Sequence, residues 1–145
     1  MTRLIDRAWP LAPLGLLGLA LVIVVIGLLA APAETPQDRI AGTVEDFAAA
    51  VDERRGEDAC ALLTPAAAKA TADSIGTLGC ATVVRSFGFA VDTGPLRVAT
   101  ILRADVNGTK ATIPADQLIV PGGKPFGPGI ALERVDGQWR VAGFT

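Results

Sequence analysis

An unbroken apolar run over residues 11–31 dominates the hydrophobic pattern of this chain; its sequence is LAPLGLLGLALVIVVIGLLAA. The run contains no charged and no polar side chain, and nothing later in the sequence resembles it. About 20 apolar residues in a helix cross the hydrocarbon core of a bilayer. The pattern therefore predicts a single transmembrane helix.

The flanks of the run predict its orientation. Arg3 and Arg7 precede it, whereas the first basic residue after it is Arg39. Basic flanks stay in the cytoplasm, so the rest of the chain is expected outside. The predicted division is a cytoplasmic N-terminus at 1–10, an anchor in the cytoplasmic membrane at 11–31, a linker at 32–36 and an extracytoplasmic domain at 37–145.

A cleaved signal peptide is the alternative interpretation of the same run. Small residues at Ala31-Pro32-Ala33 suit a cleavage site, and cleavage near Ala33 would give a secreted protein. The apolar segment is longer than the roughly 7–15 residues of a signal peptide, which favours a retained anchor. Both interpretations export the domain.

After the linker the pattern becomes helical. Thr35 followed by Pro36 is typical of a helix start. The spacing of Ile40, Val44, Phe47 and Val51 places four apolar side chains on one helix face. We expect this helix to end at residues 54–56, with Arg54 and Arg55 near its last carbonyls and Gly56 beyond.

Further short helices are predicted up to Phe87. Two acidic residues, Glu57 and Asp58, open a second helical stretch. Thr64-Pro65 repeats the cap signal before an Ala-rich helix at 66–74, and residues 80–87 form a further short helix or turn.

Beyond Gly88 the pattern is typical of strands and hairpins. Two hairpin turns are expected, at Asn107-Gly108 and at Asp136-Gly137. In the last hairpin Trp139 and Val141 share one face and Arg140 takes the other. The predicted strands are 96–106, 109–113, 117–120, 130–135 and 138–142.

Helices that come first and strands that follow indicate an α+β fold, with the helices packed on one face of a curved antiparallel sheet. Residues 34–145 are enough for one domain. We expect its core to contain Ile40, Val44, Phe47, Val51, Val98, Ile101, Leu132 and Trp139.

Charge argues against one class of partner. Of 13 basic and 15 acidic residues, Arg3, Arg7 and Asp6 precede the apolar run, which leaves 11 against 14 and a net charge of −3 for the domain. Its Lys and Arg residues form no cluster, so no nucleic-acid partner is expected.

The two cysteines, Cys60 and Cys80, are predicted to form a disulfide. A pair in a small exported domain favours a bridge, because the compartment is oxidising and the core is modest. A loop of about 20 residues would contribute on the order of 3 kcal/mol. The alternative is a metal or redox site, but the chain has no CxxC motif and no His. No metal and no cofactor are therefore expected.

Two other motifs have ordinary structural interpretations. The Gly-rich loop at 121–129 contains Lys124, but its spacing differs from that of a phosphate-binding loop, and we interpret it as a connection between strands. Asn107-Gly108-Thr109 matches a glycosylation acceptor, but a hairpin turn explains the same residues.

Two segments resemble a known family. The stretch GEDACALLTP at 56–65 and LERVDGQWRV at 132–141 are similar to exported NTF2-like (cystatin-like) domains, of which membrane-anchored and secreted versions are abundant in high-GC Gram-positive bacteria. The resemblance covers residues 36–145. It implies an α+β cone that encloses a pocket, and a homodimer formed through the sheet.

Enzymes of that family usually place an Asp, His or Tyr in the pocket, and this chain has neither His nor Tyr. Candidate general bases are Asp46, Asp92, Asp105 and Asp116, although each is more simply interpreted as a solvated residue. Ser74 and Ser86 lack a His partner and do not lie in a G-x-S-x-G elbow, so no catalytic residue is predicted.

Two functions remain as hypotheses. The first is a non-enzymatic, membrane-anchored extracytoplasmic module that binds a protein partner of the cell envelope or an apolar small ligand. It is favoured because acid–base catalysis usually needs a tunable group, and His is absent. The alternative is a pocket enzyme of the isomerase or dehydratase type that uses one buried carboxylate.

Overall fold

The computed structural model describes residues 33–76 and 78–145. The predicted cytoplasmic N-terminus and the predicted anchor at 11–31 lie outside these residues. Within the described part of the chain, no helix combines the length and the apolar character needed to span a membrane. Residues Glu34–Thr145 form one compact unit.

Helix α2, Pro36–Asp52, begins where the sequence predicts. Its first turn is closed by a capping box: the Asp38 amide donates to Thr35 Oγ1 at 3.1 Å, and the Thr35 amide donates to Asp38 Oδ2 at 2.9 Å. Pro36 fits the first helical position because the amide it lacks would be unpaired there. The predicted apolar face is confirmed as buried, with Ile40, Val44, Phe47 and Val51 all inside the core.

The predicted end of α2 is wrong by two residues. The helix ends at Asp52, and Arg54 adopts a left-handed backbone with φ 59°. The Arg54 amide donates to Val51 O at 3.1 Å, and the Arg55 amide donates to Ala50 O at 2.8 Å. These two bonds make a Schellman motif, so backbone amides satisfy the last carbonyls in place of basic side chains.

Three short helices follow: α3, Gly56–Ala61, α4, Pro65–Asp73, and α5, Cys80–Phe87. The second cap signal is confirmed, since the Ala67 amide donates to the Thr64 hydroxyl at 3.2 Å. The predicted disulfide is present: Cys60 is bonded to Cys80, with Cα atoms 6.2 Å apart. It ties α3 to α5.

A four-stranded antiparallel sheet has the order β2-β3-β6-β7. The hairpin of β6, Ile130–Val135, and β7, Gln138–Phe144, closes through Asp136 (φ 51°) and Gly137 (φ 81°), as predicted. Trp139 and Val141 are buried and Arg140 is partly exposed, which confirms the predicted alternation. The remaining strands of this sheet are β2, Asp105–Asn107, and β3, Lys110–Ile113.

The predicted strand at 96–106 is broken into three parts. Gly94–Val98 is the 3₁₀ helix η1, which buries Leu96 and leaves Val98 65% exposed, so the prediction of Val98 as a core residue is wrong. Pro95 fixes the backbone near helical φ, which outweighs the β-branched composition. After η1 come the two-residue strand β1, Thr100–Ile101, and then β2.

The register of the first hairpin also differs from the prediction. Asn107 is paired with Lys110, so the turn is Gly108-Thr109 instead of Asn107-Gly108. Gly108, with φ 60°, occupies the first turn position, which is typical of a type II′ turn.

A second sheet has the order β1-β4-β5. Strand β4, Leu118–Val120, follows the 3₁₀ helix η2, Ala115–Gln117. The Gly-rich loop is a hairpin, because β5, Lys124–Pro125, pairs back on β4 and Gly122 and Gly123 supply positive φ at the turn. The turn between these strands therefore accounts for Gly122 and Gly123.

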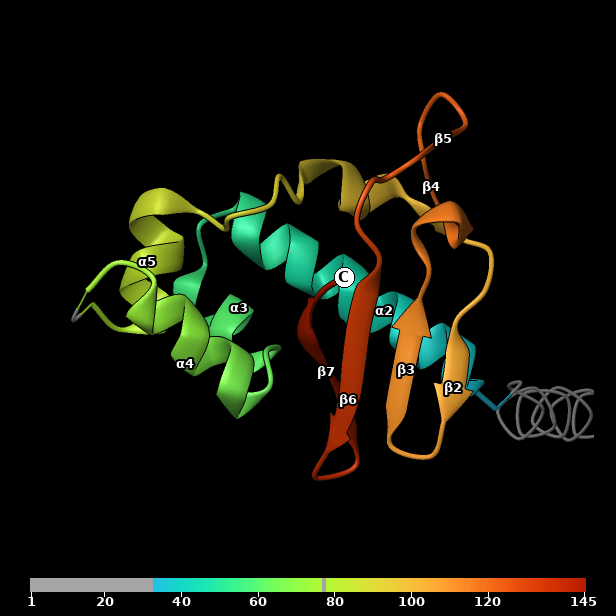
Figure 1. Cartoon of the computed structure of the whole chain (residues 1–145), viewed down its shortest axis with the longest axis horizontal. Coiled ribbons are helices and arrows are strands. Elements are labelled where there is room, and N and C mark those ends of the chain that lie inside the picture. The colour runs from blue at the N-terminus through green and yellow to red at the C-terminus, as the bar shows by residue number, and fades with distance from the viewer. Residues whose placement is uncertain (1–32, 77) are drawn as a thin grey trace, which may run out of the picture. The chain divides into compact units, whose positions relative to one another are not determined.

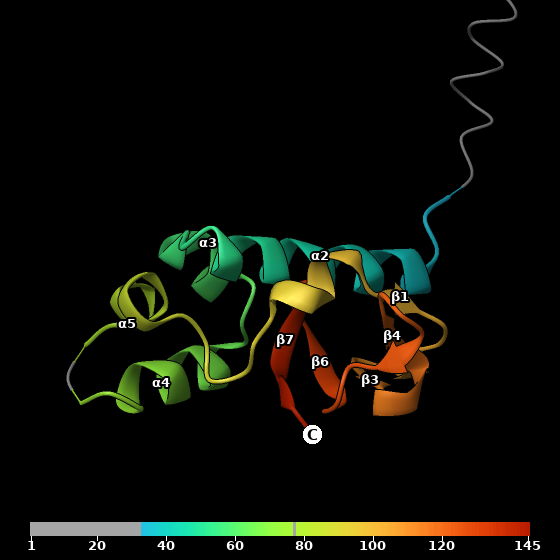
Figure 2. The same ribbon diagram turned by 90° about the horizontal axis from the view of Figure 1, so that it is seen from above.

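The elements of residues Glu34–Thr145 are arranged in layers. Helix α2 lies across one face of the four-stranded sheet, and α3, α4 and α5 gather beyond the β7 edge (Figure 1 and Figure 2). This confirms an α+β architecture with helices packed on antiparallel sheets. The core fills the space between α2 and the sheet, and its largest fully buried side chains are Phe47, Ile40, Leu63, Ile113, Leu118, Ile130 and Leu132.

Candidate functional site

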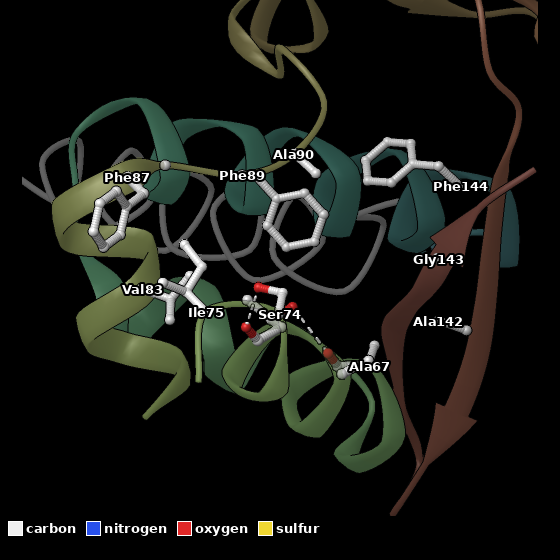
Figure 3. Close-up of a pocket in the computed structure, with 13 residues that line it drawn as sticks. Ala67, Ser74, Ile75, Val83, Phe87, Phe89, Ala90, Ala142, Gly143 and Phe144 are labelled. Atoms are coloured by element: carbon white, nitrogen blue, oxygen red, sulfur yellow. Dashed lines mark hydrogen bonds between the residues drawn. The ribbon is translucent and has the colours of Figure 1, made fainter. Parts of the chain in front are cut away.

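A hollow of about 500 Å³ lies between α4, α5 and the end of β7. Figure 3 shows Val83 and Phe87 of α5 on one side, Ala142 to Phe144 of β7 on the opposite side, and Ser74 and Ile75 along the helical floor. We call this hollow the apolar groove. Its volume lies within the range of about 300–1,000 Å³ that small-molecule sites have.

Three aromatic rings connect the apolar groove to the core. Phe89 and Phe144 line the groove, with ring centroids 5.8 Å apart. The Phe89 ring also meets buried Phe47 of α2 edge to face at 5.3 Å. Because Phe47 is fully buried, it holds the inner wall in a fixed position, and such edge-to-face contacts add to the stability from burial.

No charged side chain lines the apolar groove. Its two hydroxyls are already bonded within α4: Thr71 donates to Ala67 O at 2.9 Å, and Ser74 donates to Thr71 O at 2.7 Å. The remaining lining consists of Ala, Gly, Val, Ile and Phe. The groove therefore offers an apolar surface and few polar partners.

The rim of the groove exposes large apolar side chains. Phe87 and Ile75 both line the groove, and their exposed fractions are 58% and 40%. Isolated exposed apolar residues are ordinary on protein surfaces, but these two converge on one hollow. An apolar ligand in the groove would remove them from water.

The four candidate carboxylates are dispersed and exposed. Asp92 accepts from the Gly94 amide at 3.1 Å and so closes a turn. Asp105 pairs with Arg103 at 2.5 Å, and Asp116 accepts from the Gln117 amide group at 3.2 Å. No Asp or Glu of residues 33–76 and 78–145 is buried, so the one-carboxylate mechanism gains no support from this arrangement.

Asp46 lies on a different, polar hollow of about 390 Å³ beside α2. Asp38, Arg39 and Trp139 also line it. Asp46 is exposed there and takes part in no ion pair among the described residues. Asp46 therefore does not lie in an enclosed site of the kind that a carboxylate general base uses.

Among the described residues, two carboxylates have clearly shifted pKa values, and both shifts are downward. The Thr35 hydroxyl and amide lower the pKa of Asp38 by hydrogen bonding to its carboxylate. Hydrogen bonding from Arg85 lowers the pKa of Glu57. A general acid needs a raised carboxyl pKa, so neither group fits that role.

The other sequence candidates stay apart from one another. Ser74 lines the apolar groove, whereas Ser86 is exposed on α5. Lys124 lies in β5 and Asn107 at the end of β2, both exposed. No group of three or more Cys, Asp or Glu side chains in the described part of the chain could hold a metal ion.

Comparisons with family models, with curated proteins and with solved structures found no match to this chain. The apolar groove is therefore the feature from which a function can be argued. The sequence does not predict this groove, because Phe87, Phe89 and Phe144 are separated along the chain and their convergence depends on the fold. Their scarcity was the one available signal, since the whole chain has five Phe.

Proposed function

We propose that this protein is a non-enzymatic, membrane-anchored extracytoplasmic module that binds an apolar small ligand in the groove between α4, α5 and β7. The observation that carries the proposal is the lining: about 500 Å³ bounded by apolar side chains, with no charged group. Burial of apolar area drives ligand binding at roughly 25 cal/mol per Å². Anchoring through residues 11–31, with the domain outside the cell, is part of the proposal.

We further infer an NTF2-like (cystatin-like) cone. The supporting observations are a long first helix across an antiparallel sheet, shorter helices before the strands and a pocket bounded by both kinds of element. A protein partner of the cell envelope and a homodimer through the sheet remain proposals of the same kind. The sheet face that carries Lys110, Glu133 and Arg140 in one cross-strand row is the surface we propose for such contacts.

Photolabelling tests the ligand site. A decanol analogue with a photoactivatable diazirine is added to the full-length chain held in a nonionic amphipol, and labelled peptides are mapped by mass spectrometry. We expect label on α4, α5 and the end of β7. Ala70→Phe places a ring among the residues that line the groove, whereas Ala66→Phe adds the same side chain to α4 outside the lining.

Labelling of the groove should fall in Ala70→Phe, since the added ring takes up part of the space open to the decanol chain. It should be unchanged in Ala66→Phe. Equal labelling of both variants, or label spread evenly over the domain, would remove the groove as the binding site.

A further inference from the structure

The residues Phe87, Gly88 and Phe89 form a shared wall between two hollows. One side is the apolar groove, and the other is a small hollow of about 160 Å³ lined by Asp52, Arg54 and Asp92, among others. An apolar site and a polar site with a cation are thus separated by three residues. The middle residue of this wall has no side chain.

Arg54 is held at this wall by its backbone and its guanidinium. The Schellman motif fixes its left-handed backbone at the end of α2, and Nη1 donates to Val84 O at 3.4 Å. A Cβ placed on Gly88 would lie 3.0 Å from Nη1, 3.5 Å from Cζ and 3.7 Å from Nη2. Glycine at position 88 therefore lets the guanidinium lie directly against the wall.

The charge of Arg54 is not neutralised by an ion pair within residues 33–76 and 78–145. Two acids also line the small hollow, and a headgroup at Arg54 must lie beside them. Asp52 pairs with Arg97 at 2.7 Å, and Asp92 accepts from the Gly94 amide. Arg39, Arg134 and Arg140 are likewise outside the ion pairs of the described residues, but only Arg54 is placed against Gly88, a residue that lines the apolar groove. Donors of Arg54 thus remain for an anion.

We propose that the ligand of the groove is a single-chain anionic amphiphile whose acidic headgroup pairs with Arg54. The inference rests on the proposed function and names its ligand class. The hydrocarbon chain occupies the apolar groove, and the headgroup lies where the Arg54 guanidinium packs against Gly88, a residue that lines the groove. Arginine binds carboxylate and phosphate oxygens in its planar fork, so a fatty acid or a phosphate monoester of a long-chain alcohol fits the same site.

The test is competition for the diazirine–decanol label by three chain-matched compounds: decanol, decanoate and decyl phosphate. The full-length chain is used in nonionic amphipol, so partition into the amphipol is the same for each protein variant. Arg54→Gln removes the charge and Arg54→Lys keeps it. Arg103→Gln removes an exposed arginine of the β1–β2 connection and serves as the matched control.

Arg54→Gln should weaken competition by the acidic compounds about two- to fivefold, the range of a partly exposed ion pair, and leave decanol unchanged. Arg54→Lys should keep most of the preference, and Arg103→Gln all of it. In the unmodified chain, added salt should weaken competition by the two acidic compounds and leave competition by decanol unchanged. This measurement requires no variant. Dependence on Arg54 for decanoate alone, or for decyl phosphate alone, supports the proposal and identifies the headgroup.

The anionic headgroup would be refuted if decanol and both acids competed equally and if neither Arg54→Gln nor salt changed this. The apolar groove would then remain as the binding site. Failure of all three compounds to displace the label would overturn the proposed function as well. The two failures are therefore distinguishable in one experiment.

Discussion

Gly56 is the position where α3 approaches α5 most closely, and replacing it by alanine tests that packing. A Cβ on Gly56 would lie 2.1 Å from the Ala81 carbonyl oxygen and 2.8 Å from its carbon. Ordinary contact begins near 3.4 Å, so the two backbones must separate by about 1.3 Å. The obstacle is backbone, which has no rotamer to change.

The disulfide restricts how far the helices can separate. Cys60 and Cys80 join these same two helices with Cα atoms 6.2 Å apart, near the upper part of the range of about 4.4–6.8 Å that a bridge allows. We therefore expect Gly56→Ala to lower the free energy of unfolding by about 3 kcal/mol, the upper end for overpacking. The midpoint of urea unfolding, followed by far-ultraviolet circular dichroism, measures this loss.

Gly42→Ala is the matched control. Gly42 lies inside α2, and no atom lies within 4 Å of the Cβ it would gain. Alanine there should raise the free energy of unfolding by about 0.5–1 kcal/mol, because glycine loses more backbone entropy in a helix. If Gly56→Ala were as stable as the unmodified chain, or if both variants lost the same stability, the close approach of α3 to α5 would be refuted.

Three further predictions concern stability. Replacing both Cys60 and Cys80 by serine should cost about 3 kcal/mol for a loop with a separation of 20 residues, and reduction of the unmodified chain should cost the same in urea unfolding. An effect below about 1 kcal/mol would contradict the entropic account. Asp38 has a lowered pKa in the folded state, so its contribution to stability is full above the ordinary aspartate pKa of about 4 and is lost as pH falls through the lower folded value. In Asp38→Asn, the free energy of unfolding should therefore fall less steeply as pH is lowered below about 4. If the variant and the unmodified chain had the same pH profile, the capping box would not contribute to acid unfolding. Gly137→Ala places a Cβ at φ 81° and should cost about 1 kcal/mol, measured against Gly42→Ala by thermal unfolding.

Local signals in the sequence were sufficient wherever one side chain determines the backbone. Thr35 and Thr64 each precede a proline, and both mark the helix start because the hydroxyl accepts an amide of the first turn. The Asp136-Gly137 turn was equally predictable, since type I′ geometry needs positive φ at both positions. The helix starts and this hairpin place helices first and strands afterwards, which is the order that predicts the α+β class.

Contacts between distant segments could not be predicted in the same way. The composition of residues 96–106 favours one continuous strand. In the structure, a 3₁₀ helix that buries Leu96 replaces the first part of that strand. The apolar groove depends on Phe89 and Phe144, which are 55 positions apart in the sequence, contact each other directly and both pack on Phe47 of α2. The position of Arg54 depends on a left-handed backbone that a charged residue seldom adopts.

The short segment Leu62–Thr64 has a protective consequence for the sheet. Leu63 bridges Val141 in parallel: the Thr64 amide donates to Val141 O at 2.9 Å, and the Val141 amide donates to Leu62 O at 2.8 Å. An open edge strand can recruit another chain into a fibril, and these bonds close the middle of the β7 edge to that growth. The opposite edge is β2, only three residues long and charged at Asp105. Backbone templating is therefore blocked in the middle of the edge formed by β7, the longest strand of the described residues.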